Sequence, residues 1–144
     1  MKNFPKLQIL QLVFLISVVS TTGSLFFSEI MHLPPCVLCW YQRICMYPLT
    51  LIFMMALLTK AKDSALYGLV LSSVGLCISA YHNLLYYKII PDSITPCSEG
   101  ISCTSKQIEW LGFITIPLLS FTAFLIISIS CLLILKTERH HEKQ

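Results

Sequence analysis

The stretch Leu111–Leu135, LGFITIPLLSFTAFLIISISCLLIL, contains no charged residue over 25 consecutive positions. A helix of about 20 apolar residues is long enough to cross the hydrocarbon core of a bilayer. The stretch therefore predicts a membrane-spanning helix, and it is the longest of several similar runs in the chain.

Three further apolar runs precede this stretch at even spacing, over residues 9–28, 44–59 and 65–87. The second has only 16 residues, which would also suit a buried or re-entrant segment. It reaches 20 residues if it begins at Trp40, with Arg43 extending its charge outward to the lipid headgroups. We therefore expect an all-α polytopic membrane protein, a single domain over residues 1–144, with a bundle of four transmembrane helices near residues 9–28, 40–59, 65–87 and 111–135.

The first run could instead be a cleaved signal peptide, since Lys2 and Lys6 precede it. It is longer than the apolar part of most signal peptides, however, and no A-x-A-like cleavage site follows it. We therefore expect this segment to be retained as a helix.

The composition agrees with a membrane protein. Charged residues make up 12% of the 144 residues, about half of the roughly 25% found in soluble domains. Hydrophobic residues make up 56%, and the mean hydropathy is +0.75. A soluble domain of this length could not bury so much apolar surface. The composition also excludes a disordered chain, a fibrous repeat and a basic nucleic-acid-binding protein, and the net charge of +3 is too small to indicate an acidic partner.

The basic residues are divided unevenly between the two sides of the predicted bundle. Seven lie on the side that holds both termini, and three lie on the other side. Because cytoplasmic loops of membrane proteins carry the excess of Lys and Arg, we expect the N- and C-termini to be cytoplasmic. The seven are Lys2, Lys6, Lys60, Lys62, Lys136, Arg139 and Lys143, and the three are Arg43, Lys88 and Lys106.

Four of the seven cysteines fall in the two loops predicted to face outward, over residues 29–39 and 88–110. Disulfides persist on that oxidising side of the membrane. The other three cysteines lie within apolar runs, where a lone cysteine is usually a small packing residue. The first loop holds Cys36 and Cys39 as C-x-x-C, the second holds Cys97 and Cys103 as C-x5-C, and the remaining three are Cys45, Cys77 and Cys131.

These two extracytoplasmic cysteine loops have two structural explanations. Four cysteines could bind zinc, but the outer compartment and the C-x5-C spacing argue against it, so we expect no metal. An inert disulfide suits Cys97–Cys103 well enough. It suits Cys36–Cys39 poorly, because closing so short a loop removes little entropy from the unfolded chain. Reactivity is the better explanation of the C-x-x-C pair.

The residues around the C-x-x-C pair favour a reactive thiolate. Cys36 follows Pro34 and Pro35 at the expected start of the second helix, where unpaired N–H groups and the helix dipole stabilise negative charge. Arg43 comes four residues after Cys39 and seven after Cys36, so the three can share one helical face. An arginine at the membrane boundary is costly unless it snorkels or has a function, and a lipid-phosphate anchor is the alternative.

A disulfide that is made repeatedly needs an acceptor for two electrons. The chain contains no flavin, dinucleotide or haem-attachment fingerprint, since Trp40 rather than His follows Cys39. A lipid-soluble quinone fits the position, with Arg43 stabilising both the thiolate and negative charge on a quinone oxygen. Pro48 and Pro117 could bend their helices to make room, or could be ordinary transmembrane kinks.

A family resemblance rests on these residues. The segment Pro35–Arg43, PCVLCWYQR, followed by Met46–Leu49, MYPL, closely resembles the signature of the bacterial disulfide bond formation protein B family, DsbB, and most of all its short Gram-positive form, BdbC. The second cysteine loop, Glu109–Gly112 and Pro117 match in order and spacing, so the resemblance covers nearly the whole chain. The second loop is shorter than in many members of the family.

The resemblance implies an enzyme, a quinone-dependent protein thiol-disulfide oxidoreductase of the bacterial cell membrane. Such an enzyme reoxidises an extracytoplasmic thioredoxin-like thiol oxidase, a DsbA- or BdbD-like protein. It passes the electrons to menaquinone or ubiquinone and so sustains disulfide formation in exported proteins.

Site residues follow from the same resemblance. Cys97–Cys103 is implied to be the disulfide that meets the partner protein. Cys36–Cys39 is implied to be the quinone-linked pair, with Cys39 nearest the ring and Arg43 as its charge partner.

His82, near the outer end of the third helix, could lie beside the quinone site, although a hydrogen-bonded interfacial histidine is the alternative. Two other functions also remain open. The chain could be a non-catalytic tetraspan protein with permanent disulfides, or a quinone reductase similar to vitamin K epoxide reductase. In the latter family the C-x-x-C follows the loop cysteines, whereas here it precedes them.

Overall fold

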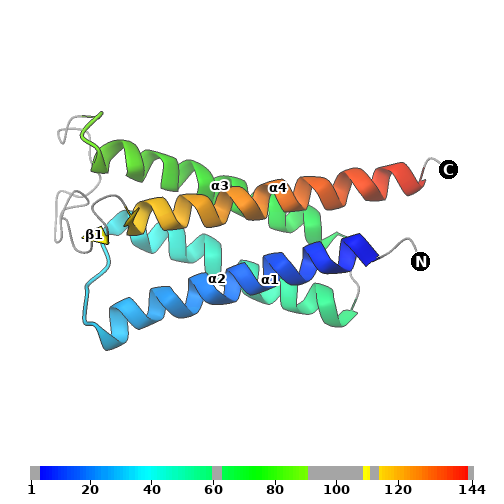
Figure 1. Cartoon of the computed structure of the whole chain (residues 1–144), viewed down its shortest axis with the longest axis horizontal. Helices are drawn as coiled ribbons and strands as arrows, with labels where there is room; N and C mark the ends of the chain where they lie inside the picture. Colours follow the sequence, from blue (N-terminus) through cyan, green and yellow to red (C-terminus); the bar gives the residue numbers. More distant parts are fainter. Residues whose placement is uncertain (1–3, 60–62, 91–108, 111–113, 143–144) are drawn as a thin grey trace.

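Four long helices run alongside one another in the computed structural model (Figure 1), which describes residues 4–59, 63–90, 109–110 and 114–142. Each helix contacts the next one along the chain, and the first also contacts the last, so the four close into a ring. The helices are α1 (Phe4–Leu25, continued by the π-helical turn η1, Phe26–Ile30), α2 (Val37–Thr59), α3 (Ser64–Tyr86) and α4 (Ile116–Glu142). The expected all-α four-helix bundle is confirmed.

The lengths and surfaces of these helices suit a membrane. At 1.5 Å per residue, 22 residues in α1 extend over about 33 Å, slightly more than the roughly 30 Å of a hydrocarbon core. Within the described residues, four helices are long and apolar enough to cross a bilayer. Large apolar side chains cover their outward faces, among them Leu15, Ile44, Leu51, Leu58, Val70 and Leu132. Such a surface is stable against lipid tails and not against water.

Helix ends differ from the sequence expectation in ways that bear on the site. Helix α2 begins at Val37 instead of Trp40, so Arg43 lies inside its second turn. Helix α4 begins at Ile116 instead of Leu111, because β2 (Ile114–Thr115) pairs antiparallel with β1 (Glu109–Trp110). Pro117 consequently falls in the first turn of α4, where its missing N–H is not needed. It therefore starts a helix and does not bend one, while Pro48 lies inside α2.

The core of the bundle is built around two phenylalanines and two glycines. Phe53 and Phe124 are completely buried, and each ring lies against a glycine of α3. A Cβ atom added to Gly68 would lie 2.8 Å from the ring of Phe53, and one added to Gly75 would lie 2.3 Å from the ring of Phe124. Both distances are shorter than van der Waals contact, so these glycines allow α3 to approach α2 and α4 closely.

The N- and C-termini lie at the same end of the bundle, and the connection from α1 to α2 lies at the opposite end (Figure 1). At the terminal end, Lys6 Nζ donates to Glu138 Oε1 and joins the start of α1 to the end of α4. The opposite end carries the C-x-x-C pair, at the start of α2. The bundle therefore separates the C-x-x-C pair from the two termini by its full length.

Candidate active site

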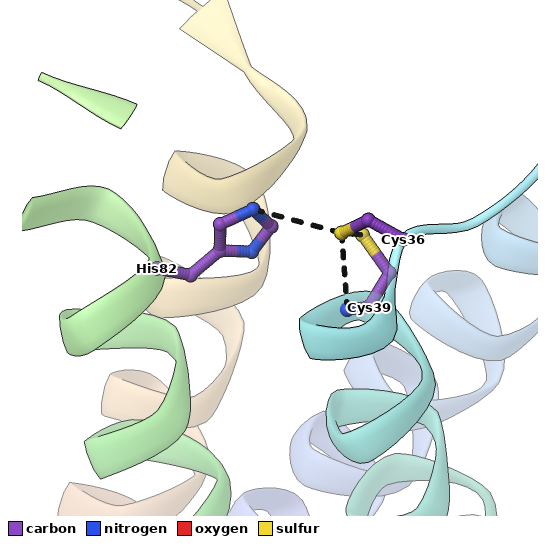
Figure 2. A group of neighbouring side chains, drawn as sticks. All are labelled: Cys36, Cys39 and His82. Carbon is purple, nitrogen blue, oxygen red and sulfur yellow. Dashed lines mark hydrogen bonds between the residues drawn. The ribbon is translucent and has the colours of Figure 1, made fainter. Parts of the chain in front are cut away.

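Cys36 immediately precedes α2 and acts as its N-terminal cap (Figure 2). Its carbonyl oxygen accepts from the backbone N–H of Trp40 at 3.1 Å, which is the first hydrogen bond of the helix. Its sulfur accepts from the backbone N–H of Cys39 at 3.4 Å. A serine, threonine or aspartate oxygen usually makes this second contact at a helix N-terminus. The cap therefore fixes the Cys36 sulfur over the free N–H groups of α2.

The two sulfurs of the C-x-x-C pair lie side by side. Cys36 Sγ and Cys39 Sγ are 3.0 Å apart, and both cysteines are free thiols. Cys36 is 7% exposed, whereas Cys39 is only partly buried. The pair can therefore form a disulfide with little movement, and Cys39 is the more accessible of the two.

His82 of α3 faces the capping sulfur from across the bundle (Figure 2). It is 2% exposed, and its Nε2 lies 3.9 Å from Cys36 Sγ. Its other ring nitrogen, Nδ1, accepts from Gln42 Nε2 at 3.1 Å. An imidazole that accepts at Nδ1 carries its proton on Nε2 when neutral. His82 thus presents an N–H group to the sulfur of Cys36.

Gln42 extends this contact to the fourth helix. Its Oε1 accepts from Ser120 Oγ at 2.7 Å while its amide nitrogen contacts His82. A continuous chain of polar contacts therefore runs from Cys36 through His82 and Gln42 to Ser120, and it joins α2, α3 and α4 at the level of the thiols.

The surroundings of Cys36, which precedes the membrane-spanning part of α2, favour its thiolate. A hydrogen bond from the Cys39 thiol, then contacts with His82 and the Cys39 backbone N–H, lower the pKa of the Cys36 thiol to about 4. Burial acts in the opposite direction, because desolvation disfavours charge, but the hydrogen bonds outweigh it. Cys36 is therefore ionised at neutral pH when the pair is reduced.

A cavity of about 350 Å³ lies between α1, α2 and α4, directly beside the C-x-x-C pair. Cys39 lines it, together with Gln42 and Ser120, but Cys36 does not. Most of its wall is apolar, and the wall residues come from α1 and η1 (Val19, Ser20, Gly23, Ser24, Phe27), the connection to α2 (Leu33, Pro35), α2 (Met46, Tyr47) and α4 (Ile116, Leu119, Phe124).

Arg43 also lines this cavity, and two contacts hold its guanidinium group in place. Its Nη2 donates to the backbone oxygen of Ser24 in α1 at 3.0 Å, and its guanidinium carbon lies 5.5 Å from the centre of the Trp40 ring. Cys39 and Arg43 both line the cavity from α2, in agreement with their spacing of four, whereas Cys36 precedes the helix and does not line the cavity.

Comparison with known proteins agrees with this arrangement. The family model described as "Disulfide bond formation protein DsbB" matches residues 6–134. This chain belongs to the DsbB family.

Curated relatives cover most of the chain. The SPbeta prophage-derived disulfide bond formation protein B of Bacillus subtilis is 44% identical over 135 residues, which cover 92% of this chain and 90% of the relative. The probable disulfide formation protein C of Halalkalibacterium halodurans is 46% identical over 114 residues, covering 79% and 83% of the two chains. No solved structure matches significantly. Membership of the DsbB family, together with four apolar helices, indicates a multi-pass membrane thiol-disulfide oxidoreductase.

The other cysteines of this DsbB family member have different settings. Cys97 and Cys103 lie outside the described residues. Cys45 and Cys131 are buried in the core, and Cys77 is exposed on the outward face of α3. None of these three lines the cavity.

The C-x-x-C pair and His82 could also hold a metal ion. The two sulfurs and a ring nitrogen lie within 4.8 Å of one another. Tetrahedral zinc with bonds of about 2.3 Å would set two thiolates roughly 3.8 Å apart, however. Cys36 Sγ and Cys39 Sγ are 3.0 Å apart, so they would have to separate to hold zinc in this way. Their spacing suits thiol-disulfide exchange better.

Three polar residues of the site were not identified from the sequence of this DsbB family member. Gln42 and Ser120 bridge His82 to α4, and Tyr47 lines the cavity. Gln42 and Tyr47 are in or next to the recognised motif, and Tyr47 follows Arg43 by four residues. The spacing of Tyr47 from Arg43 was the available signal for its place in the wall, whereas only the packing of α2 against α3 and α4 reveals the partners of Gln42.

Proposed function

We propose that this protein reoxidises an extracytoplasmic thioredoxin-like thiol oxidase and passes the electrons to a membrane quinone. The observation that carries the proposal is that the two cysteines of the C-x-x-C pair have different surroundings. Cys39 lines the apolar cavity, while Cys36 lies outside it, beside His82. One sulfur can thus meet an acceptor in the cavity while the other closes the disulfide.

The cavity fits a quinone ring in size and chemistry. Its volume of about 350 Å³ lies within the range of roughly 300–1,000 Å³ typical of small-molecule sites. Phe27 and Phe124 offer apolar surface for a flat ring, and Arg43 offers a positive charge near Cys39. The cavity lies between helices that are apolar enough to span a membrane, where a lipid-soluble acceptor would be concentrated.

The chemistry balances with the residues present. With Cys36 already a thiolate at neutral pH, because its pKa is about 4, the reduced pair loses two electrons and the single proton of the Cys39 thiol as the Cys36–Cys39 bond forms. A quinone in the cavity would supply the two-electron acceptor beside Cys39, and the second proton that its reduction requires would come from solvent. Cys36 therefore needs no base to close the bond to Cys39 as the electrons of that sulfur pass to the acceptor. Arg43 would stabilise negative charge on the Cys39 side, and the apolar walls exclude water.

The second cysteine pair completes the proposed relay. By resemblance to the family, Cys97–Cys103 accepts electrons from the partner oxidase and Cys36–Cys39 receives them next. The site would then face the outside of the bacterial cell membrane, with both termini in the cytoplasm, as the seven-to-three division of basic residues predicts.

Purified protein tests the proposal directly. It is mixed with a reduced thioredoxin-like oxidase and a short-chain quinone, and both quinone absorbance and partner thiols are followed. We expect one quinone consumed for each partner disulfide formed, loss of turnover in Cys39→Ser, and normal turnover in Cys77→Ser. Disulfides that neither accept partner electrons nor respond to quinone would instead indicate a structural tetraspan protein.

Orientation has its own test. A membrane-impermeant thiol reagent is applied to reduced intact cells that express single-cysteine variants. We expect Cys97 and Cys103 variants to be labelled without permeabilisation. Protection of both until the membrane is opened would reverse the proposed orientation.

A further inference from the structure

We infer that the hydroxyl of Tyr47 is a hydrogen-bond donor to the quinone bound in this cavity; the inference rests on the proposed function. The hydroxyl oxygen of Tyr47 is buried, and within the described part of the chain it has no hydrogen-bond partner. The polar side chains of Gln42, Arg43 and Ser120, which also line the cavity, all have hydrogen-bond partners. Tyr47 therefore needs an acceptor that a ligand can supply.

An unpartnered hydroxyl at this position is costly. Buried polar groups in proteins are nearly always hydrogen-bonded, because desolvation without a new bond is unfavourable. The cost cannot be relieved by bulk water here, since Tyr47 lies within the membrane-spanning length of α2, eleven residues after Cys36 at the helix start. A phenylalanine would fill the same space without that cost. The hydroxyl is thus explained if the cavity receives a ligand with an oxygen acceptor.

The placement of Tyr47 relative to Arg43 suits a ligand with two such acceptors. Cys39, Arg43 and Tyr47 follow one another at intervals of four residues, and all three line the cavity. At 1.5 Å per residue, successive positions on this face are about 6 Å apart along the axis. The two carbonyl oxygens of a quinone project from opposite edges of its ring by a similar distance. Arg43 would then contact the oxygen near Cys39, and Tyr47 the one deeper in the bundle.

A neutral donor at the deeper oxygen has two consequences. It strengthens its hydrogen bond as negative charge develops on that oxygen during reduction, without bringing a second charge into the membrane. It also selects ligands that carry an acceptor at that edge, because a ring without one would leave the hydroxyl unpaired. Tyr47 transfers no proton in this proposal, and the electron and proton balance of the reaction is unchanged.

The substitution Tyr47→Phe tests the inference, with Tyr67→Phe as the matched control. Tyr67 is an exposed tyrosine in the first turn of α3, and it does not line the cavity. With a short-chain menaquinone and a short-chain ubiquinone as probes, we expect Tyr47→Phe to raise the KM for quinone roughly three- to tenfold, the loss expected for one neutral hydrogen bond. The KM for the partner oxidase should not change, and Tyr67→Phe should behave as the wild type.

A spectroscopic measurement separates a ligand contact from a structural role. The quinone is labelled with carbon-13 at each carbonyl in turn, and the infrared band of the bound carbonyl is recorded. A hydrogen bond lowers this frequency, so one of the two bands should rise in Tyr47→Phe while the other stays fixed. Unchanged bands and an unchanged KM, in a protein that still reduces quinone, would overturn the role of Tyr47. Absence of quinone reduction in the wild type would overturn the proposed function itself.

Discussion

The sulfur of Cys36 caps the helix that carries Cys39, and the backbone N–H of Cys39 donates to it at 3.4 Å. One residue therefore both starts α2 and supplies half of the redox pair. The positive end of the helix dipole and the free N–H groups of the first turn act on the sulfur that lies outside the cavity. The fold thus stabilises charge on Cys36 and leaves Cys39 to face the cavity.

The ionisation of Cys36 gives the first prediction. Its thiolate exists above its pKa, so the alkylation rate of Cys36 in reduced protein should stay near its plateau from neutral pH down to about pH 5. It should fall only as the pH passes through about 4, whereas an ordinary cysteine loses reactivity below about 8.5. Site-resolved mass spectrometry after brief iodoacetamide pulses measures this profile.

His82 provides the matched change for that experiment. His82→Ala removes a contact that lowers the pKa of Cys36, so the midpoint of the alkylation profile should move to higher pH. The hydrogen bond from Cys39 remains and is the larger influence, so the midpoint should stay below that of a free thiol. A wild-type midpoint near 8.5 would contradict both expectations.

The bridge made by Gln42 gives the second prediction. Gln42→Leu leaves His82 Nδ1 and the Ser120 hydroxyl each without one partner. Leaving a buried polar group unsatisfied costs about 1–3 kcal/mol, so the thermal unfolding temperature in detergent should fall measurably. Gln8→Leu, at an exposed position of α1, is the control and should leave that temperature nearly unchanged. An equal effect of the two substitutions would argue against the bridge.

The sequence predicts the helices of this protein better than it predicts the contacts between them. The four helices follow from the length of apolar runs, which reports a helix independently of its neighbours. The apolar run predicts too early a start for α4, because it does not reveal that Ile114–Thr115 pairs with Glu109–Trp110. The motif predicts that the C-x-x-C pair is the centre of the site. The contacts of Gln42 with His82 and Ser120 depend on how α2 is rotated against α3 and α4, which no single helix encodes.

The two close-packed glycines give the third prediction. A Cβ atom at position 75 would lie 2.3 Å from the ring of Phe124, a cavity-lining residue that is completely buried. Gly75→Ala should therefore destabilise the protein by about 1–3 kcal/mol, as overpacking of a core does, and should also raise the KM for quinone. Gly23→Ala is the control for stability, because its Cβ atom would meet nothing within 4 Å. Unfolding temperature is measured for both variants, and the KM for quinone is compared only between Gly75→Ala and the wild type, because Gly23 itself lines the cavity.

The charge of Arg43 gives the fourth prediction. If it stabilises negative charge beside Cys39, Arg43→Ala should raise the KM for quinone about ten- to a hundredfold, as expected for losing a hydrogen bond to a charged group. The KM for the partner oxidase should change far less. Arg43→Lys should restore only part of the loss, because a flexible ammonium lacks the planar fork that also contacts the oxygen of Ser24. Arg139→Ala, at an exposed position near the end of α4, is the control. Equal losses toward both substrates, in step with loss of folded protein, would support a lipid anchor.

The order of thiol exchange gives the last prediction. If Cys97 lies in an outer loop, as the sequence predicts, we expect a soluble partner to reach it more easily than Cys39 in the cavity wall, so that the partner's thiolate attacks Cys97 and releases Cys103. Each exchange passes through a mixed disulfide, and removing the sulfur that resolves it should trap the intermediate. A reduced partner variant that keeps only its attacking cysteine has no second thiol to resolve the mixed disulfide, so it should accumulate a reductant-sensitive adduct with Cys97 of the wild-type protein as Cys103 is released. Non-reducing electrophoresis and mass spectrometry would detect this adduct. Cys97→Ser should not form it, and Cys45→Ser, Cys77→Ser and Cys131→Ser should stay active. An adduct on Cys36 or Cys39 with Cys97 unmodified would show that the partner bypasses the outer loop. The partner would then be expected to attack Cys39 and to release Cys36, because the low pKa of Cys36 makes it the better leaving group.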